Sequence, residues 1–466
     1  MTQLLGTQKA TGQRPLPPSV KGLPIIGPLP MMTKDFFGFI TEARETYGDA
    51  YTLNFGPTKA IILNHPRHVE HVFLRHATNY SKGGPMWATI RDLIGNGLAS
   101  SEGDFWRKQR RMIQPQFHHQ RIAGLANLMM EAIDEGLADW DIAVDTNQSI
   151  DAEKAFSRIT MKVIVKTMFG TGLNNEEADK VGNALTYALD YILKGVVTNM
   201  LPSWLPAPGR KQYQTAIDTI DEIVFGVIER RQQSGEEGDD LISLLLSAVD
   251  EESGQGMSKQ QLRDEAVTMF LAGYETTATA LKWAFYVLKE QPDIVKRLYD
   301  EIDLTLGDRT PTFADLRNLP YPRRVFQEAL RLFPPAWWLM RTAVEDDEID
   351  GYRIPAGTIV TPIPYTIHRH PDFWPEAEKF DPDRFTPERL SGQHKQAWVP
   401  FGAGQRMCIG REFALMEGQL ILTRIFQKYR LLLSPEPNPT IDTGQMRVST
   451  IIKSKDPILL DFSPRS

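Results

Sequence analysis

The sequence predicts a mainly α fold with a smaller β portion, and three observations support this. Its 466 residues are 41% hydrophobic and 24% charged, as is usual for a globular protein. From about residue 66 to residue 332, apolar residues recur mainly at helical spacing, and short strand-like runs flank this stretch. No linker separates two apolar cores, so we expect a Pro-rich segment over residues 1–30 and one domain over residues 31–466.

The N-terminal part is expected to be extended at first and then to form a helix and a hairpin. Prolines in residues 15–18 and 23–27 predict a stiff, extended chain. A helix follows, with the aromatic residues of 36–40 on or near one side. The apolar runs at residues 51–53 and 61–63 are joined by a Gly-Pro turn and predict a β-hairpin.

The helical stretch is expected to break at residues 83–85, 201–202 and 235–240, where glycine, proline or clustered acids occur. The acidic break is interpreted as a solvated connector. A largely apolar helix is predicted over residues 260–288, and an amphipathic helix is predicted over residues 411–429.

Strand-like runs return after the helical stretch and supply the rest of the β portion. One strand is expected at residues 358–360. A final pair is expected at residues 447–452 and 458–460, with the turn at residues 455–457.

Charge and cysteine content restrict the partners and the compartment. The 52 basic and 59 acidic residues give a net charge of -7, which argues against a nucleic-acid surface. A single cysteine fits a reducing compartment, and the first residues contain no apolar run long enough to span a bilayer. We therefore expect a soluble, cytoplasmic protein with no nucleic-acid partner and no membrane anchor.

The most informative stretch is residues 401–410, Phe-Gly-Ala-Gly-Gln-Arg-Met-Cys-Ile-Gly. Cys408 is the only cysteine, so neither a disulfide nor a multi-cysteine metal cage explains it. Arg406 and the N-terminus of the helix that follows both favour a thiolate at this sulfur. A lone thiolate suits one axial bond to an iron porphyrin. The alternative interpretation is a buried core cysteine.

The pattern Phe-x-x-Gly-x-Arg-x-Cys-x-Gly resembles the haem-binding loop of the cytochromes P450. The resemblance implies a triangular, mostly α prism with haem b between the long apolar helix and the helix after Cys408. It implies that Cys408 ligates the iron and that Phe401 also belongs to the cofactor site. It further implies a monooxygenase that inserts one atom of O2 into a C–H bond or a C=C bond.

A second motif, Ala-Gly-Tyr-Glu-Thr-Thr at residues 272–277, lies inside the predicted apolar helix. Thr276 can bond back to a carbonyl and Gly273 permits local widening, so that together they can hold a water pocket. Glu275 can then exchange protons towards that pocket. The alternative is a pair that caps or bends the helix. The motif resembles the family's acid–alcohol pair, which implies catalytic roles for Glu275 and Thr276 and places Ala272 at the haem.

A third motif is Glu328-Ala329-Leu330-Arg331, whose charged ends share one helical face. Taken alone, this spacing favours a surface ion pair. Arg384 lies between aromatic residues in a proline-containing stretch further along the chain. The combination resembles the family's Glu-x-x-Arg motif with a distant arginine. That resemblance implies a buried triad that serves haem incorporation and folding rather than catalysis.

The resemblance also places four residues at the haem propionates. Trp106 and Arg110 are four residues apart and so lie on the same helical face. Arg341 and Arg406 are further arginines, whose fork geometry suits carboxylates. Each arginine alone would fit an ordinary surface charge. Three basic neighbours are expected to be solvated or to face a redox partner: Arg107, Lys108 and Arg111.

The resemblance further implies an apolar pocket above the haem for a lipophilic substrate such as a fatty acid, a terpenoid or a polyketide. For each residue of this pocket, ordinary core packing is the alternative. The expected wall residues are Met86, Trp87, Phe270, Leu271, Ala336, Trp337, Leu339 and Met446.

Partners and alternatives follow from the same resemblance. Too few residues follow Cys408 for a fused reductase, so electrons are expected from a separate ferredoxin- or flavodoxin-like protein with an NAD(P)H reductase. A haem-thiolate peroxygenase or isomerase is one alternative, and it would tend to lack the acid–threonine pair. A non-catalytic haem sensor is the other, and it would need neither Thr276 nor a redox partner.

Two pairs of histidines invite a metal interpretation. His368 and His370 lack a third ligand at helical spacing, so we expect them to be structural. The pair His118 and His119 is expected to lie at the surface.

Overall fold

A computed structural model describes residues 14–465, apart from residues 25, 57, 171–172, 200–207, 235–239, 251, 253, 437 and 439–442. The break expected at residues 201–202, and nearly all of the acidic connector expected at 235–240, lie outside the described residues. The break at residues 83–85 is confirmed, because a helix begins at Gly84 with Gly83 as its N-cap.

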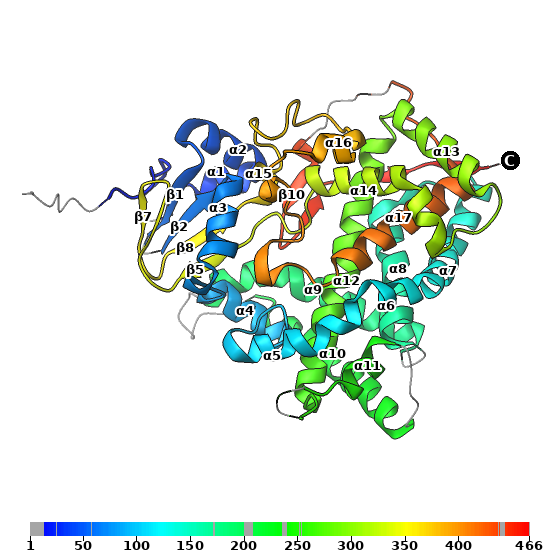
Figure 1. Ribbon diagram of the computed structural model, residues 1–466, viewed down its shortest axis with the longest axis horizontal. Helices are drawn as coiled ribbons and strands as arrows, with labels where there is room; N and C mark the ends of the chain where they lie inside the picture. The colour runs from blue at the N-terminus through cyan, green and yellow to red at the C-terminus, as the bar shows by residue number, and fades with distance from the viewer. Residues whose placement is uncertain are drawn as a thin grey trace, which may run out of the picture.

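Helices make up most of the described chain (Figure 1). The α-helices are α1 (Leu29–Lys34), α2 (Phe36–Tyr47), α3 (Pro66–Glu70), α4 (Gly84–Ile94), α5 (Gly103–Ile113), α6 (His119–Gly124), α7 (Ala126–Asp145), α8 (Ala152–Ile164), α9 (Asn175–Asn199), α10 (Arg210–Ser234), α11 (Leu241–Ser247), α12 (Lys259–Leu288), α13 (Pro292–Leu306), α14 (Pro320–Leu332), α15 (Pro364–Ile367), α16 (Pro387–Leu390) and α17 (Arg411–Lys428). Two π-helical turns are η1 (His71–Arg75) and η4 (Val165–Phe169). The 3-10 turns are η2 (Ala77–Asn79), η3 (Gln114–Phe117), η5 (Phe313–Asn318), η6 (Pro382–Phe385), η7 (Lys395–Ala397), η8 (Gly404–Arg406) and η9 (Thr443–Gln445).

The strands are short, so the predicted mainly α fold with a smaller β portion is confirmed. They are β1 (Ala50–Phe55), β2 (Thr58–Leu63), β3 (Tyr80–Ser81), β4 (Ile150–Asp151), β5 (Arg341–Ala343), β6 (Asp347–Ile349), β7 (Tyr352–Ile354), β8 (Ile359–Pro362), β9 (Tyr429–Leu431), β10 (Met446–Val448), β11 (Ile452–Ser454), β12 (Leu459–Leu460) and β13 (Phe462–Pro464). Among the described residues, one sheet has the order β1-β2-β8-β5-β3, and the other strands pair as β10–β11, β12–β4, β13–β9 and β6–β7.

The five-stranded sheet and the helical part occupy opposite ends of the molecule (Figure 1). Helix α12 crosses the middle of the helical part and packs against α8, α10, α14 and α17. Helix α17, which follows Cys408, therefore lies beside α12 in the core.

Helix α12 confirms the apolar helix predicted over residues 260–288. Ser258 begins it with a capping box, in which Gln261 N–H donates to Ser258 Oγ at 3.2 Å and Ser258 N–H donates to Gln261 Oε1 at 2.7 Å. Most of its side chains between Leu262 and Leu288 are buried. Packing on all sides, rather than a single apolar stripe, therefore stabilises this helix.

The N-terminal hairpin is also confirmed. Strands β1 and β2 pair antiparallel from Phe55 opposite Thr58 to Ala50 opposite Leu63. β2 also pairs in parallel with β8, which overlaps the strand predicted at residues 358–360 but begins one residue later and extends to Pro362.

The Cys408 loop turns on two glycines with positive φ, 71° at Gly402 and 65° at Gly404. A Cβ atom on Gly404 would lie 2.1 Å from the carbonyl oxygen of Phe73, so only glycine fits there. Cys408 N–H donates to the Phe401 carbonyl at 2.9 Å and closes the loop. Helix α17 then confirms the helix predicted after Cys408, with Tyr429 as its C-cap. Its predicted amphipathic character is wrong, because residues 415–423 are all buried.

Two local predictions are wrong. The C-terminal hairpin joins β10 to β11 through residues 449–451, and residues 459–460 pair instead with β4 near residue 150. The Lys-Asp-Pro turn therefore separates strands of different sheets, and sequence cannot rank a distant partner against a local one. Residues 23–27 are not extended either, because Leu23 and Gly27 exchange backbone hydrogen bonds at 2.9 Å across a turn.

Within the described residues, no helix combines the length and apolar character that a membrane span requires.

Candidate active site

Cys408 sits on the glycine turn with accessible surface, although burial raises the pKa of its thiol. The Gly410 N–H and the charge of Arg110 act in the opposite direction and favour the thiolate. Arg110 also donates to the Met407 carbonyl at 3.1 Å, which fixes the loop to α5. The cation beside the sulfur is thus Arg110, whereas the sequence suggested Arg406. A thiolate here needs a positively charged partner such as a metal ion.

The Arg406 side chain points away from the sulfur. Its partners lie on α5 and on the segment that precedes α5. Its guanidinium donates to the Ser101 carbonyl at 2.8 Å and pairs with Glu102 at 3.1 Å. It also stacks on the buried Trp106 ring, 3.8 Å from the ring centroid.

Two buried cations, Arg341 and Lys82, lie near Arg406 and form a cation cluster with it. Burial and the charge of Arg406 lower the pKa of Arg341 to about 10, and burial lowers the pKa of Lys82 well below its usual value. Glu102 is the carboxylate that offsets them, and it is already shared by Arg406 and the Lys82 N–H. In the described part of the chain this leaves a buried excess of positive charge. Two further carboxylates would compensate it.

One stretch of α12 keeps accessible surface in the middle of an otherwise buried helix. Ala272 is exposed, and Leu271, Gly273 and Thr276 are partly exposed. Thr276 Oγ1 donates to the Ala272 carbonyl at 2.6 Å, as the back-bonding prediction requires. The accessible stretch therefore offers apolar surface and one hydroxyl.

Glu275 lies on a different side of α12, where it is buried. Thr186 Oγ1 donates to its Oε1 at 3.3 Å, and Tyr274 shares that hydroxyl at 2.8 Å. Within the described residues, its Oε2 has no hydrogen-bond partner. Burial raises the pKa of Glu275, and the charge of Lys453 offsets this only in part.

A small cavity of about 20 Å³ adjoins the Glu275 carboxylate, enough for one water molecule. It is lined by Glu153, Ser157, Glu275, Ala278, Thr279, Lys282, Ile451 and Lys453. Lys282 pairs with Glu153 at 2.9 Å, and Lys453 pairs with Asp190 at 2.9 Å. Glu275 is thus connected to a group of charged side chains rather than to Thr276 directly.

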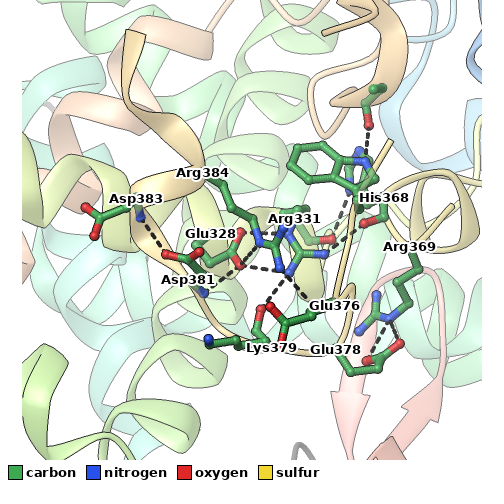
Figure 2. A network of polar contacts seen from close by, with 12 residues as sticks. Glu328, Arg331, His368, Arg369, Glu376, Glu378, Lys379, Asp381, Asp383 and Arg384 are labelled. Carbon is green, nitrogen blue, oxygen red and sulfur yellow. Dashed lines mark hydrogen bonds and ion pairs between the residues drawn. The ribbon is translucent and has the colours of Figure 1, made fainter. Parts of the chain in front are cut away.

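Glu328 and Arg331 are fully buried and Arg384 is partly buried, and Figure 2 shows the polar network that they form. Arg331 donates to both oxygens of Glu328, at 2.6 and 2.7 Å, and Arg384 Nε lies 3.4 Å from Oε1. Arg331 also donates to the carbonyls of His368 at 2.9 Å and Lys379 at 3.1 Å. The network therefore joins α14 to the irregular segment that precedes the Cys408 loop.

The predicted substrate residues divide into two groups. Met86, Trp87, Leu271, Ala336 and Leu339 keep accessible surface. Three others are core residues: Phe270, Trp337 and Met446.

The three core residues were expected to line the pocket, but their side chains pack inside the protein. Phe270 is 1% exposed and packs on Phe169 and Tyr274, at ring centroid distances of 5.6 and 5.8 Å. Trp337 donates to the Ser449 carbonyl at 2.9 Å and packs on the aromatic rings of α2. Met446 is 3% exposed.

An open groove of about 800 Å³ lies on the α5 side of the Cys408 loop. It is lined by Trp106, Arg107, Arg110, Arg111, Gln114, Pro115, His118, Gln120 and Arg121. Arg111 pairs with Asp250 at 2.6 Å, and Lys108 lies 3.8 Å from the same carboxylate. Arg107 pairs with Asp104 in the first turn of α5.

Sequence reasoning missed Lys82, Glu102 and Glu417. Lys82 and Glu102 are single charged residues before α4 and α5, and nothing nearby in the sequence shows that they meet. Glu417 is fully buried in α17, and its position between apolar residues at helical spacing is the signal that could have found it.

The paired histidines behave as expected. His368 is buried, with Nδ1 3.0 Å from the Arg331 carbonyl and Nε2 accepting the Val399 N–H at 2.8 Å. His118 and His119 are exposed.

Taken with the cation cluster, the accessible thiol of Cys408 defines the class: a haem-thiolate protein. Residues 17–460 match the Cytochrome P450 family, so the chain belongs to that family and is a haem-dependent monooxygenase. The residues present fit a haem, because the single thiol shares its loop with Arg406, and Arg406, Arg341 and Lys82 have only Glu102 as a nearby carboxylate among the described residues.

Curated relatives and solved structures agree with this assignment. The chain is 35% identical to cyclooctat-9-en-7-ol 5-monooxygenase of Streptomyces melanosporofaciens, over 85% of this chain and 84% of that protein. It is 33% identical to cyclooctatin synthase of the same organism (92% and 94%) and 32% identical to pentalenene oxygenase of Streptomyces avermitilis (89% and 91%). The crystal structure of the cytochrome P450DA haem domain superposes with a TM-score of 0.87 at 28% identity, covering 98% of this chain and 99% of that chain.

Proposed function

We propose that Cys408 is the iron ligand of haem b in this monooxygenase and that the accessible stretch of α12 bounds the opposite face of the haem. The observation that carries this proposal is that the chain's only thiol shares one loop with Arg406, a member of the buried cation cluster. One thiolate and a cluster of cations that outnumbers its carboxylates match the iron and the two propionates of haem b.

When bound, the haem supplies the activation of O2 that lets one oxygen atom enter the substrate. The residues of the chain hold the haem and stabilise the charges around it. Arg110 and the Gly410 N–H stabilise negative charge on Cys408 Sγ. Arg341 and Arg406, together with Lys82, would neutralise the propionates, and the Trp106 indole N–H would be a neutral hydrogen-bond donor to them.

Glu275 and Thr276 supply the proton path. The raised pKa of Glu275 favours its protonated form, its Oε2 has no hydrogen-bond partner among the described residues, and Glu275 lines the water-sized cavity. The charged groups beyond that cavity, Lys453 and Lys282 with their carboxylates, connect it towards solvent. Thr276 Oγ1 donates to Ala272, so its lone pairs can accept a hydrogen bond from a water on the accessible side.

We infer that the substrate is a lipophilic terpenoid. The accessible wall residues Met86, Trp87, Leu271, Ala336 and Leu339 are all apolar, which suits a hydrocarbon skeleton. The relatives named after cyclooctat-9-en-7-ol and pentalenene act on terpenoids. Hydroxylation of an unactivated C–H bond is the reaction this pocket supports.

The experiment is a spectral screen of the purified, haem-loaded protein against cyclic terpenes, terpene alcohols, long-chain fatty acids and polyketide lactones. We expect cyclic terpenoids to shift the ferric spin state, and a surrogate redox system to convert them to hydroxylated products detected by mass spectrometry. Spin shifts and products obtained only with fatty acids or polyketides would contradict the terpenoid assignment and leave the haem site intact.

The electron donor is proposed to be a separate ferredoxin- or flavodoxin-like protein, itself reduced by an NAD(P)H reductase. Arginines line the groove beside the Cys408 loop, and an acidic partner would complement them. The Arg121→Glu variant should slow reduction of the haem by such a partner, and the defect should shrink as ionic strength rises. The single cysteine supports a cytoplasmic location.

A further inference from the structure

Histidines and carboxylates gather around η1 and the β6–β7 hairpin, on the sheet side of the molecule, where the monooxygenase chemistry uses none of them. Two triplets bring ligand atoms within 4.8 Å of one another. One is Asp49, His65 and His370, and the other is His71, His76 and Asp347. The two triplets differ in which imidazole nitrogens are already engaged.

The first triplet is locked by backbone hydrogen bonds. Arg67 N–H donates to His65 Nδ1 at 3.0 Å, and Asp372 N–H donates to His370 Nδ1 at 3.3 Å. A neutral imidazole that accepts at Nδ1 carries its proton on Nε2. His370 Nε2 accordingly donates to Asp49 at 3.1 Å. This triplet is a set of donors and acceptors rather than a metal site.

In the second triplet, the imidazole nitrogens that face the Asp347 carboxylate are available to bind a metal ion. His71 Nε2 lies 2.8 Å from Asp347 Oδ2, and His76 Nδ1 lies 3.5 Å from the same oxygen. A first-row metal at about 2.0–2.1 Å from each ligand requires ligand atoms roughly 2.9–3.4 Å apart. The observed separations bracket that range. Among the described residues, neither His71 Nδ1 nor His76 Nε2 has another hydrogen bond, so each is free to carry the proton.

The π-helical turn produces this arrangement. His76 N–H donates to the His71 carbonyl at 2.9 Å, an i,i+5 bond that places the two residues one above the other. Their rings stack at a centroid distance of 4.0 Å and an interplanar angle of 16°. In a regular α-helix, side chains five residues apart would point in different directions.

Hydrogen bonds from two further residues fix the orientation of the Asp347 carboxylate. Tyr80 Oη donates to Asp347 Oδ2 at 2.7 Å, and the Glu348 N–H donates to Oδ1 at 2.7 Å. Support of a ligating carboxylate by a second residue is typical of metal sites.

The electrostatic setting favours a cation. Asp347 lies in the acidic run of residues 345–348 at the start of the β6–β7 hairpin. Arginines near the triplet are paired with other acids. Arg75 pairs with Glu70 at 2.7 Å, and Arg353 and Arg14 pair with Asp346 and Glu348 of the acidic run. His76 is 45% exposed, which gives an ion a path from solvent, whereas Asp347 is 10% exposed.

We propose that His71, His76 and Asp347 form a binding site for one divalent first-row transition metal, Zn²⁺ or a close relative. Two imidazoles and one carboxylate occupy three positions, and water completes the coordination. The ion would fix both ends of η1 to β6. Phe73, in the middle of η1, packs its carbonyl against Gly404 of the Cys408 loop and its ring under Arg341 at 4.5 Å, so the bound metal would brace the haem side of the sheet.

The test is equilibrium dialysis of the tag-free, haem-loaded protein against Zn²⁺, with the metal content measured by mass spectrometry. We expect one saturable equivalent of Zn²⁺. His76→Ala and Asp347→Asn should weaken binding by at least about 100-fold, and Tyr80→Phe by about tenfold. The matched control is the double variant His118→Ala/His119→Ala, which removes two exposed histidines elsewhere and should bind Zn²⁺ as the parent does.

The haem spectrum of each variant, recorded without added metal, verifies that it is folded. No saturable binding by the parent protein up to about 100 µM Zn²⁺ would overturn the proposal. Binding that survives His76→Ala, or that is lost in the His118/His119 variant or in His370→Ala alone, would overturn it equally.

Discussion

The Glu328 network and the acids in α12 and α17 both place carboxyl groups in the core, but they differ in how completely those groups are paired. Glu328 receives Arg331, Arg384 and the Asp381 N–H at 2.9 Å (Figure 2). Glu275 and Glu417, by contrast, have oxygens without hydrogen-bond partners among the described residues.

The difference separates two uses of buried charge. A carboxylate that accepts several hydrogen bonds holds one geometry, and breaking the pair leaves an uncompensated charge. A carboxylate without partners has a raised pKa and keeps a proton, which it can exchange. The first region therefore joins α14 to the segment before the Cys408 loop, and the second holds buried acids whose protonated form is favoured.

The largest effect should come from the paired region. Arg331→Ala leaves Glu328 buried without its main partner, and we expect the free energy of unfolding to fall by about 3–5 kcal/mol with loss of bound haem. Urea unfolding and haem content measure this. Lys296→Ala, which removes an exposed i,i+4 pair with Asp300, is the control and should cost less than about 0.5 kcal/mol. A similarly small loss in Arg331→Ala would show that the pairing does not hold this region.

The unpaired region should respond in the opposite direction. Burial raises the pKa of Glu417 from 4.5 to about 8, so the folded state binds its proton more tightly than the unfolded state. The favourable contribution is complete below pH 4.5 and is lost as the pH rises towards 8. Glu417→Gln should therefore stabilise the protein, by at most about 3 kcal/mol at pH 7 and by almost nothing at pH 4.5.

Urea unfolding of Glu417→Gln and the parent at several pH values between 5 and 8 tests the sign. Glu412→Gln, which changes a half-exposed acid of the same helix, is the control and should show no such trend. A Glu417→Gln variant that is destabilised, or whose gain does not grow with pH, would contradict the unpaired description.

The smallest effect on stability, with a large effect on chemistry, is expected at Thr276. Its hydroxyl bonds only within its own helix, so Thr276→Ala should change the free energy of unfolding by less than about 1 kcal/mol. Without this hydroxyl, NAD(P)H oxidation should yield peroxide in place of hydroxylated product.

The ratio of product to peroxide per NAD(P)H is the measurement for this variant. Thr167→Ala removes a buried hydroxyl with the same kind of back-bond, to Val163 at 2.6 Å, and should leave the ratio unchanged. An unchanged ratio in Thr276→Ala would refute the proton-path role.

The comparison also shows what could be predicted from the sequence. Helix α12 and the β1–β2 hairpin follow from local periodicity and turn residues, and they were predicted. Glu328 and Arg331 could be paired because both lie on one helical turn. The pairing of residues 459–460 with β4 could not be predicted, because some three hundred residues separate the partners and no local signal ranks them.

The site shows the same limit. Cys408 was identifiable as the single thiol in a glycine-rich loop, but its neighbouring cation is Arg110 from α5 rather than the nearby Arg406. Phe270 was predicted as pocket wall from the resemblance to the family. On the helix it lies on a different face, and its ring is buried.

The most direct test of the central claim is the visible spectrum of the reduced, carbonyl-bound protein and of its Cys408→Ser variant. If Cys408 ligates the iron, the parent protein shows the red-shifted Soret band of haem-thiolate proteins and the variant lacks it. A red-shifted band that persists in Cys408→Ser, or a parent protein without that band, would contradict the assignment of Cys408.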